Sequence, residues 1–257
     1  MPLNSDVMPL NRSAKTRLFE KAIETLNIAP GSTQRILDFG CGRGELLGRL
    51  FEVVGSGSRL VGFDAIGKSI EAATATYPGI EFIREKFIEK LPFPDSSFDV
   101  VVTIDAIESV SNKELLVSEF RRVLRPSGQV LAMHWDWDTQ TYNIQSREIA
   151  RKAVAAFSDW KQPWMDEADG QMGRKLWGLF EGSGQFQGAP GTCTLVETQY
   201  EPGKYGYDRV QDLLSLVDEG CFDPVEYQQF CRELSESIDK GEYLYSLTSF
   251  LYSGVTA

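Results

Sequence analysis

The sequence is poor in the residues that build metal sites and disulfide frameworks. Its 257 residues include one histidine and four cysteines, and the cysteines stand far apart without C-x-x-C spacing. From this pattern we expect reduced thiols, a cytoplasmic protein and no zinc or iron site. No metal is therefore predicted, although a magnesium site made only of carboxylates stays open.

Long apolar runs and clusters of positive charge are also missing. No stretch approaches the length of a membrane span, and the first ten residues lack the basic start and apolar run of a secretory signal. With 26 basic and 37 acidic residues, the net charge is −11, which disfavours binding to phosphate backbones. We therefore expect a small-molecule substrate and neither a nucleic-acid nor a membrane partner. The oligomeric state stays open.

What the sequence does contain is 42% hydrophobic residues, arranged in a regular alternation of strands and helices. Between residues 35 and 138, short apolar runs typical of buried strands alternate with amphipathic stretches typical of helices. This alternation predicts an α/β fold with a doubly wound, mostly parallel sheet. The expected strands are 36–39, 59–63, 81–84 and 99–104, and a fifth strand is expected to follow a turn within 124–133.

The core is organised around residues 35–50, RILDFGCGRGELLGRL. An apolar run containing Asp38 leads into glycines at positions 40, 42 and 44, and a helical stretch follows. A strand that turns through glycines into a helix presents backbone N–H groups that a ligand can approach closely. The spacing D-x-G-x-G-x-G differs from the G-x-G-x-x-G of dinucleotide-binding oxidoreductases, which remain the alternative enzyme class.

The glycine motif and the segment LPFPDSSFDVVV at 91–102 resemble the class I S-adenosylmethionine-dependent methyltransferases. Within them, the second segment resembles the methyltransferase type 11 group, which is related to quinone-methylating enzymes. The resemblance covers residues 35–138 and implies a Rossmann-like, seven-stranded sheet whose last strand is antiparallel. It also implies S-adenosylmethionine as the cofactor and S-adenosylhomocysteine as the product.

We interpret residues 1–257 as one domain with two additions to the cofactor-binding core at 35–138. Residues 11–28 form an amphipathic pattern, and in the resembling family this leading helix covers the cofactor. Residues 139–190 break the alternation and are predicted to form a helical cap between strands five and six. The sequence then predicts strand six at 192–199, helices within 207–239 and a last strand at 243–255.

The resemblance places the cofactor at the ends of the first strands. Asp64 stands 20 positions after Gly44, where a carboxylate accepts hydrogen bonds from the ribose hydroxyls; the alternative is that it caps the helix at 67–75. The acid that the family carries near adenine is replaced by Phe87. The predicted cofactor-binding residues are Asp38, Gly40, Cys41, Gly42, Gly44, Asp64, Ala65, Ile66, Phe87, Ile88 and Ile104.

The catalytic residues are predicted at the ends of strands four and five, because ligands of open parallel sheets bind beyond the carboxyl ends of the strands. Asp105 and His134 occupy these ends and are predicted to be catalytic, with the histidine as a general base. A purely structural role for the lone histidine stays open. The predicted substrate-binding residues are Trp135, Trp137, Tyr142 and Glu108.

The residues around His134 also bear on the acceptor atom. Aromatic faces beside carboxylates suit a cationic substrate, which slightly favours a nitrogen nucleophile over oxygen or carbon. The alternative is that the tryptophans pack the cap against the sheet. A non-catalytic S-adenosylmethionine-binding partner protein is a further alternative.

Overall fold

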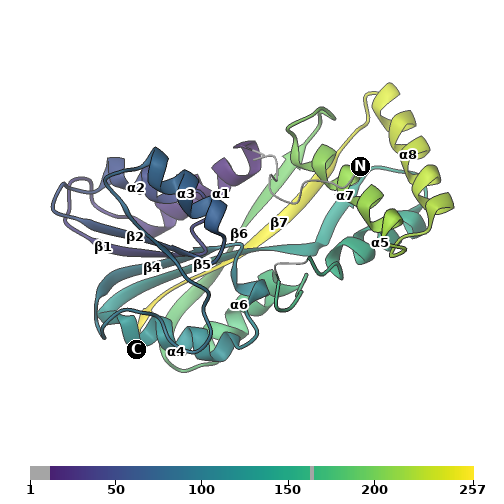
Figure 1. Cartoon of the computed structure of the whole chain (residues 1–257). Helices are drawn as coiled ribbons and strands as arrows, with labels where there is room; N and C mark the ends of the chain where they lie inside the picture. Colours follow the sequence, from purple (N-terminus) through teal and green to yellow (C-terminus); the bar gives the residue numbers. More distant parts are fainter. Residues whose placement is uncertain (1–11, 163–164) are drawn as a thin grey trace.

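The computed structural model describes residues 12–162 and 165–257, which form a seven-stranded sheet with helices on both faces (Figure 1). β7 pairs antiparallel with both of its neighbours, β5 and β6, whereas the other strand pairs are parallel, and β7 lies inside the sheet rather than at its edge. The predicted α/β architecture with an antiparallel last strand is confirmed. In spatial order the strands are β3 (Glu81–Arg84), β2 (Arg59–Asp64), β1 (Arg35–Phe39), β4 (Phe98–Ile104), β5 (Leu124–Tyr142), β7 (Tyr245–Thr256) and β6 (Phe186–Glu197).

The helices fall into three groups, as Figure 1 shows. One face of the sheet carries α1 (Arg12–Leu26), α2 (Glu45–Val53) and α3 (Gly67–Thr76), and the other carries α4 (Lys113–Val123) and α6 (Met172–Glu181). The third group packs together at the far end and consists of α5 (Arg147–Ser158), α7 (Tyr205–Asp218) and α8 (Pro224–Asp239). We call this third group the cap. Among the described residues, no helix is both long and apolar enough to cross a bilayer.

Local chemistry explains why the predicted helical stretch at 207–239 forms two helices. Asp223 accepts hydrogen bonds from the N–H groups of Val225 and Glu226 and so caps the start of α8. Pro224 follows in the first turn, where its missing N–H costs no hydrogen bond.

Strand β5 differs most from the sequence-based expectation. We expected it to end near Met133, but it continues to Tyr142, which pairs with Tyr245 of β7. Residues 139–190, predicted as a helical cap, therefore begin and end in strands, since β6 starts at Phe186. Of the helices between these strands, α5 joins the cap and α6 packs beside α4. The run after Met133 escaped prediction because acids interrupt its apolar residues.

The extended β5 separates its tryptophans from its acids. Trp135 and Trp137 belong to the hydrophobic core that includes α1 and the cap. Asp136 lies on the opposite face, where its carboxylate is fully buried and bound by Arg174 of α6. The alternation expected for a strand is confirmed, and these tryptophans pack the cap against the sheet.

The loop at residues 85–97 connects β3 to β4 and is held by one side chain of α4. Arg122 donates hydrogen bonds to the carbonyl oxygens of Leu91 at 3.0 Å and Phe93 at 2.7 Å. It also pairs at 2.6 Å with Glu119, whose carboxylate accepts the Leu91 N–H. Burial alone would raise the pKa of Glu119, but the hydrogen bonds from Arg122 and Leu91 hold it below its ordinary value.

Replacing this arginine should destabilise the fold. We expect Arg122→Ala to lower the free energy of unfolding by about 2–4 kcal/mol, because the buried Glu119 carboxylate and two carbonyl groups lose their donor. Urea denaturation would measure the loss. The matched control is Arg121→Ala, since the hydrogen bond of Arg121 within the described part of the chain is a long one, 3.4 Å to the Ala257 carbonyl. Equal losses in the two variants would contradict the assignment.

Candidate functional site

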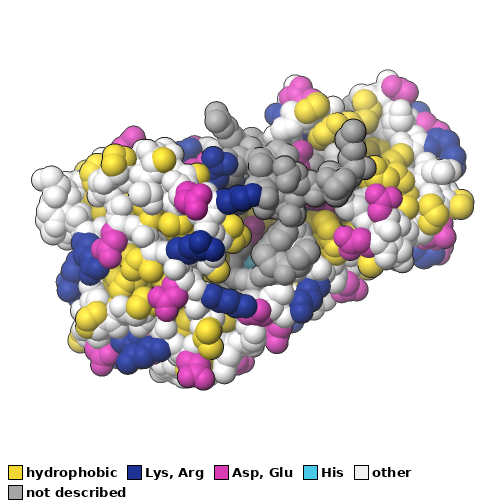
Figure 2. Space-filling model, in the orientation of Figure 1, with side chains coloured by type: hydrophobic (Ala, Val, Ile, Leu, Met, Phe, Trp, Pro, Cys, Tyr) yellow, Lys and Arg dark blue, Asp and Glu magenta, His cyan; other side chains and the backbone are white. Residues whose placement is uncertain are grey.

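A cavity of about 920 Å³ lies between the carboxyl ends of the parallel strands and the cap. Its size is at the upper end of the range for ligand pockets, so it has room for a cofactor and an acceptor together. The described lining holds ten acidic and five basic residues. In Figure 2, Lys and Arg side chains gather on the half of this face that holds the parallel strands. The cavity as a whole favours a positively charged ligand.

Most residues predicted to bind a cofactor line this cavity. Two of them do not: Gly44 packs against Phe82 and Ala73, and Ile88 is 73% exposed. From α1, Lys15, Leu18 and Phe19 also reach the lining. The predicted residues that do line it are Asp38, Gly40, Cys41, Gly42, Asp64, Ala65, Ile66, Phe87 and Ile104.

Two glycines of the loop after β1 serve different purposes. Gly40 has φ 77°, and an added Cβ would lie 2.2 Å from the Cβ of Ala106, so no side chain fits beside the residues that follow β4. Gly42 has φ 53°, and an added Cβ would meet no atom within 4 Å. Gly42 therefore leaves the backbone open to the cavity, whereas Gly40 permits close packing within the protein.

Asp64 holds the glycine loop in place. Its two carboxylate oxygens accept hydrogen bonds from the N–H groups of Gly42 and Ile66, both at 2.8 Å. The helix α3 begins after Ile66, which acts as its N-cap without a side-chain hydrogen bond, so Asp64 does not cap α3. A carboxylate oxygen has two acceptor positions, and Asp64 therefore keeps acceptor capacity towards the cavity.

Asp38 is a buried carboxylate at the floor of the cavity. Only 3% of the residue is exposed. Burial and, to a smaller extent, the nearby negative charge of Asp64 together raise its pKa to about 8. A cation placed beside Asp38 would stabilise its charged form.

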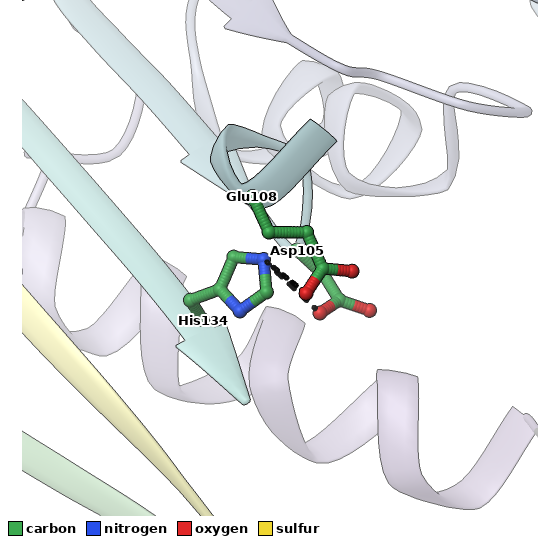
Figure 3. Close-up of side chains that lie close together, drawn as sticks. All are labelled: Asp105, Glu108 and His134. Carbon is green, nitrogen blue, oxygen red and sulfur yellow. Dashed lines mark ion pairs between the residues drawn. The ribbon is translucent and has the colours of Figure 1, made fainter. Parts of the chain in front are cut away.

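The predicted catalytic residues meet in one cluster, drawn in Figure 3. The Nε2 atom of His134 lies 3.7 Å from Asp105 Oδ1 and 3.8 Å from Glu108 Oε2. Glu108 stands on the short 3₁₀ helix η1 (Ile107–Ser109) and also accepts a hydrogen bond from the Trp137 indole at 3.3 Å. Burial raises the pKa of Glu108 to about 7, although the facing His134 lowers it.

The members of this cluster are not equally accessible. Asp105 and Glu108 line the cavity, whereas His134 is fully buried behind them and outside the lining. Asp105 has φ 58°, an unusual backbone conformation for a residue other than glycine, and its N–H donates to the carbonyl of Met133 at 2.9 Å. Such conformations cluster at functional sites.

The remaining predicted substrate residues lie differently. Trp137 lines the cavity, but Trp135 is fully buried and Tyr142 donates a hydrogen bond to Gln140 within the core. Trp135 and Tyr142 therefore do not contact a ligand in this cavity. Sequence reasoning placed them at the site because it ended β5 too early.

The structure adds Arg209 of α7, which sequence reasoning missed. Its guanidinium carbon lies 4.6 Å from the ring centre of Tyr205, 5.2 Å from Phe157 and 5.8 Å from Trp137. Asp212 pairs with it at 2.6 Å. Arg209 is buried and lines the cavity, yet nothing in the helical pattern of α7 distinguishes it from an arginine on a solvated face. The aromatic wall thus surrounds a cation that belongs to the protein.

Comparison with known proteins gives independent information on this chain. Residues 37–132 match the family model described as a methyltransferase domain. The matched segment includes the glycine loop, Asp64 and the Asp105–Glu108 part of the cluster.

Two curated relatives and one solved structure show how far the similarity extends. A Streptomyces fradiae protein, described as an uncharacterized 37.1 kDa protein in transposon TN4556, is 33% identical over 140 residues, covering 53% of this chain and 40% of that protein. A second relative is the UbiE protein of Xanthomonas campestris pv. campestris, a ubiquinone/menaquinone biosynthesis C-methyltransferase. It is 28% identical over 195 residues, covering 66% of this chain and 75% of that protein. The chain spans 38–40% of the length of the first relatives it matches.

The structural similarity covers more of the chain than the sequence similarity. The YcgJ protein of Bacillus subtilis superposes with a TM-score of 0.60 at 19% identity, covering 92% of this chain and 97% of that one. This likeness supports the fold, including the parts outside residues 37–132.

Proposed function

We propose that this chain transfers the methyl group of S-adenosylmethionine to a small-molecule acceptor, because residues 37–132 match the methyltransferase-domain family model. One observation carries the proposal. The glycine loop, Asp38 and Asp64 line the same cavity as the Asp105–Glu108 pair, so a cofactor and an acceptor have adjoining places.

The sheet side of the cavity suits the cofactor. S-adenosylmethionine carries a sulfonium and an amino group, and Asp38 offers a buried carboxylate next to the open backbone of Gly42. The free acceptor capacity of Asp64 faces the space for the ribose. Phe87 lies edge-on to Phe39, with ring centres 6.1 Å apart, and offers adenine an apolar contact where the family has an acid.

The cap side of the cavity suits the acceptor. Methyl transfer from a sulfonium is an in-line displacement, so the protein must align the nucleophile and exclude water. In our proposal Asp105 and Glu108 face the acceptor and take up the proton that it loses. His134 stands behind these carboxylates and acts through them as a positioning residue, rather than as a base that touches the acceptor.

Arg209 changes the preferred acceptor atom. The sequence favoured nitrogen because aromatic faces were expected to be open to a cation. The faces of Trp137, Phe157 and Tyr205 are instead turned to the guanidinium of Arg209. We therefore propose an acidic carbon or hydroxyl acceptor, as the named C-methyltransferase activity of the UbiE relative also suggests. A nitrogen acceptor remains a prediction from the sequence.

Label transfer tests the proposed activity. We expect the protein to move an isotope-labelled methyl group from S-adenosylmethionine into a small molecule of a pooled metabolite extract, detected by mass spectrometry. The mass and fragmentation of the product would report whether carbon, oxygen or nitrogen is methylated. Cofactor binding without transfer would indicate a non-catalytic partner protein, and preferential binding of NAD would indicate an oxidoreductase.

Asp64 should be required for tight cofactor binding. We expect Asp64→Ala to weaken S-adenosylmethionine binding by at least about 1–2 kcal/mol, because it removes the acceptor for the ribose hydroxyls and the support of Gly42. Isothermal titration calorimetry would measure this loss. Glu85→Ala, which removes another cavity-lining carboxylate, serves as the control. An unchanged affinity in Asp64→Ala would show that Asp64 does not contact the cofactor.

Asp38 should make cofactor binding dependent on pH. Its pKa is about 8 in the unliganded protein, and an adjacent cation lowers it, so binding at pH 7 releases a proton. We expect affinity to rise by up to about tenfold per unit between pH 6 and 8 and to level off above. Calorimetry in buffers of different ionisation heat would count the proton. If Asp38→Asn kept the same pH dependence, another group would be responsible.

A further inference from the structure

The orientation of His134 leaves one of its nitrogens facing two carboxylates. Nδ1 lies 2.8 Å from the carbonyl oxygen of Trp135, and because a carbonyl only accepts, Nδ1 must carry the hydrogen. In the neutral ring, Nε2 is then a lone-pair acceptor. This atom is buried and has no hydrogen-bond partner among the described residues, and the same holds for Asp105 Oδ1 in front of it. Three acceptors, Nε2 and the oxygens of Asp105 and Glu108, thus converge on one point (Figure 3).

From this geometry we infer that Asp105, Glu108 and His134 bind one divalent transition-metal ion. The atoms that converge are acceptors of the kinds that such ions bind, one imidazole nitrogen and two carboxylate oxygens. A hydrogen bond from the far ring nitrogen to a backbone carbonyl is also how histidine ligands of metals are usually held, because it fixes both the tautomer and the ring plane.

The spacing fits an ion better than it fits direct hydrogen bonds. The separations of 3.7 and 3.8 Å from Nε2 exceed the range of a hydrogen bond. Two ligand atoms that share an ion at ~2.1 Å can lie up to ~4.2 Å apart, so both pairs can contact one ion. All three ligand atoms lie within 4.8 Å of one another. A small rotation of a carboxylate then brings the third ligand atom within bonding distance of the same ion.

The ligand set and its surroundings narrow the choice of ion. An imidazole ligand favours zinc, copper, iron or nickel over calcium, magnesium and manganese, which prefer oxygen ligands. Three protein ligands leave open positions, as in catalytic metal sites. Since Asp105 and Glu108 line the cavity, those positions face the acceptor. Resting on the proposed function, we expect the ion to bind an acceptor oxygen and lower its pKa, while a carboxylate oxygen of Asp105 or Glu108 that does not contact the ion takes up the proton.

Metal uptake by the whole chain tests this site without cofactor or acceptor. Protein stripped with a chelator and desalted would be titrated with Zn²⁺ against a chromophoric chelator, and with Co²⁺ to record its visible spectrum. We expect one equivalent of either ion. Asp105→Asn, Glu108→Gln and His134→Asn should each weaken binding by at least about tenfold. Glu85→Gln, the same change at another cavity-lining acid, should bind as the wild type does.

The outcomes separate the site from the proposed activity. His134 is fully buried, so the folding of each variant is checked by circular dichroism. If His134→Asn does not fold, Glu108→Gln at the cavity wall decides the question. If the wild-type protein takes up no metal ion, the proposal is overturned. It is also overturned if all three variants bind the ion as the wild type does, because the ion would then bind elsewhere, for example at the exposed Cys221. Either failure leaves methyl transfer as a separate measurement, which does not depend on uptake.

Discussion

The site depends on the parallel pairing of β4 with β5. In this ladder Ile104 lies opposite Met133, so the residues that follow, Asp105 and His134, are side by side although 29 positions separate them in the chain. The N–H of Asp105 continues the pairing by donating to the Met133 carbonyl. A shift of the pairing register by one residue would turn the His134 side chain to the other face of the sheet, away from Asp105 and Glu108. The chemistry is thus tied to the most central strands, which are also the least able to move.

Residues that act through local structure could be predicted from the sequence. The glycine loop, Asp38 and Asp64 stand at strand ends, and short apolar runs mark those strands clearly. The course of β5 beyond Met133 could not be predicted, because its acids bind Arg174 of α6, a partner 38 positions away from Asp136. The strand propensity of these residues carries no information about a partner so far away in the sequence. The prediction that Trp135 and Tyr142 lie at the substrate site was therefore wrong, whereas the predicted fold was right.

The role of Arg209, on the cap side of the cavity, also could not be predicted, because it depends on tertiary contacts. Its burial is favourable only because three rings from α7, α5 and β5 surround it and Asp212 pairs with it. Each of these residues is unremarkable alone, and only the packing of the cap on the sheet joins them. Tertiary contacts therefore decide whether aromatic side chains offer an open face to a ligand or enclose a charge of the protein.

Several ionisable side chains of the cavity are almost fully buried. Ligands that offset their charges would therefore stabilise the folded protein. Burial raises the pKa values of Asp38 and Glu108, so charging either carboxylate in the unliganded protein costs free energy. A cationic cofactor beside Asp38 and a cation within the Asp105–Glu108–His134 cluster would each remove part of that cost.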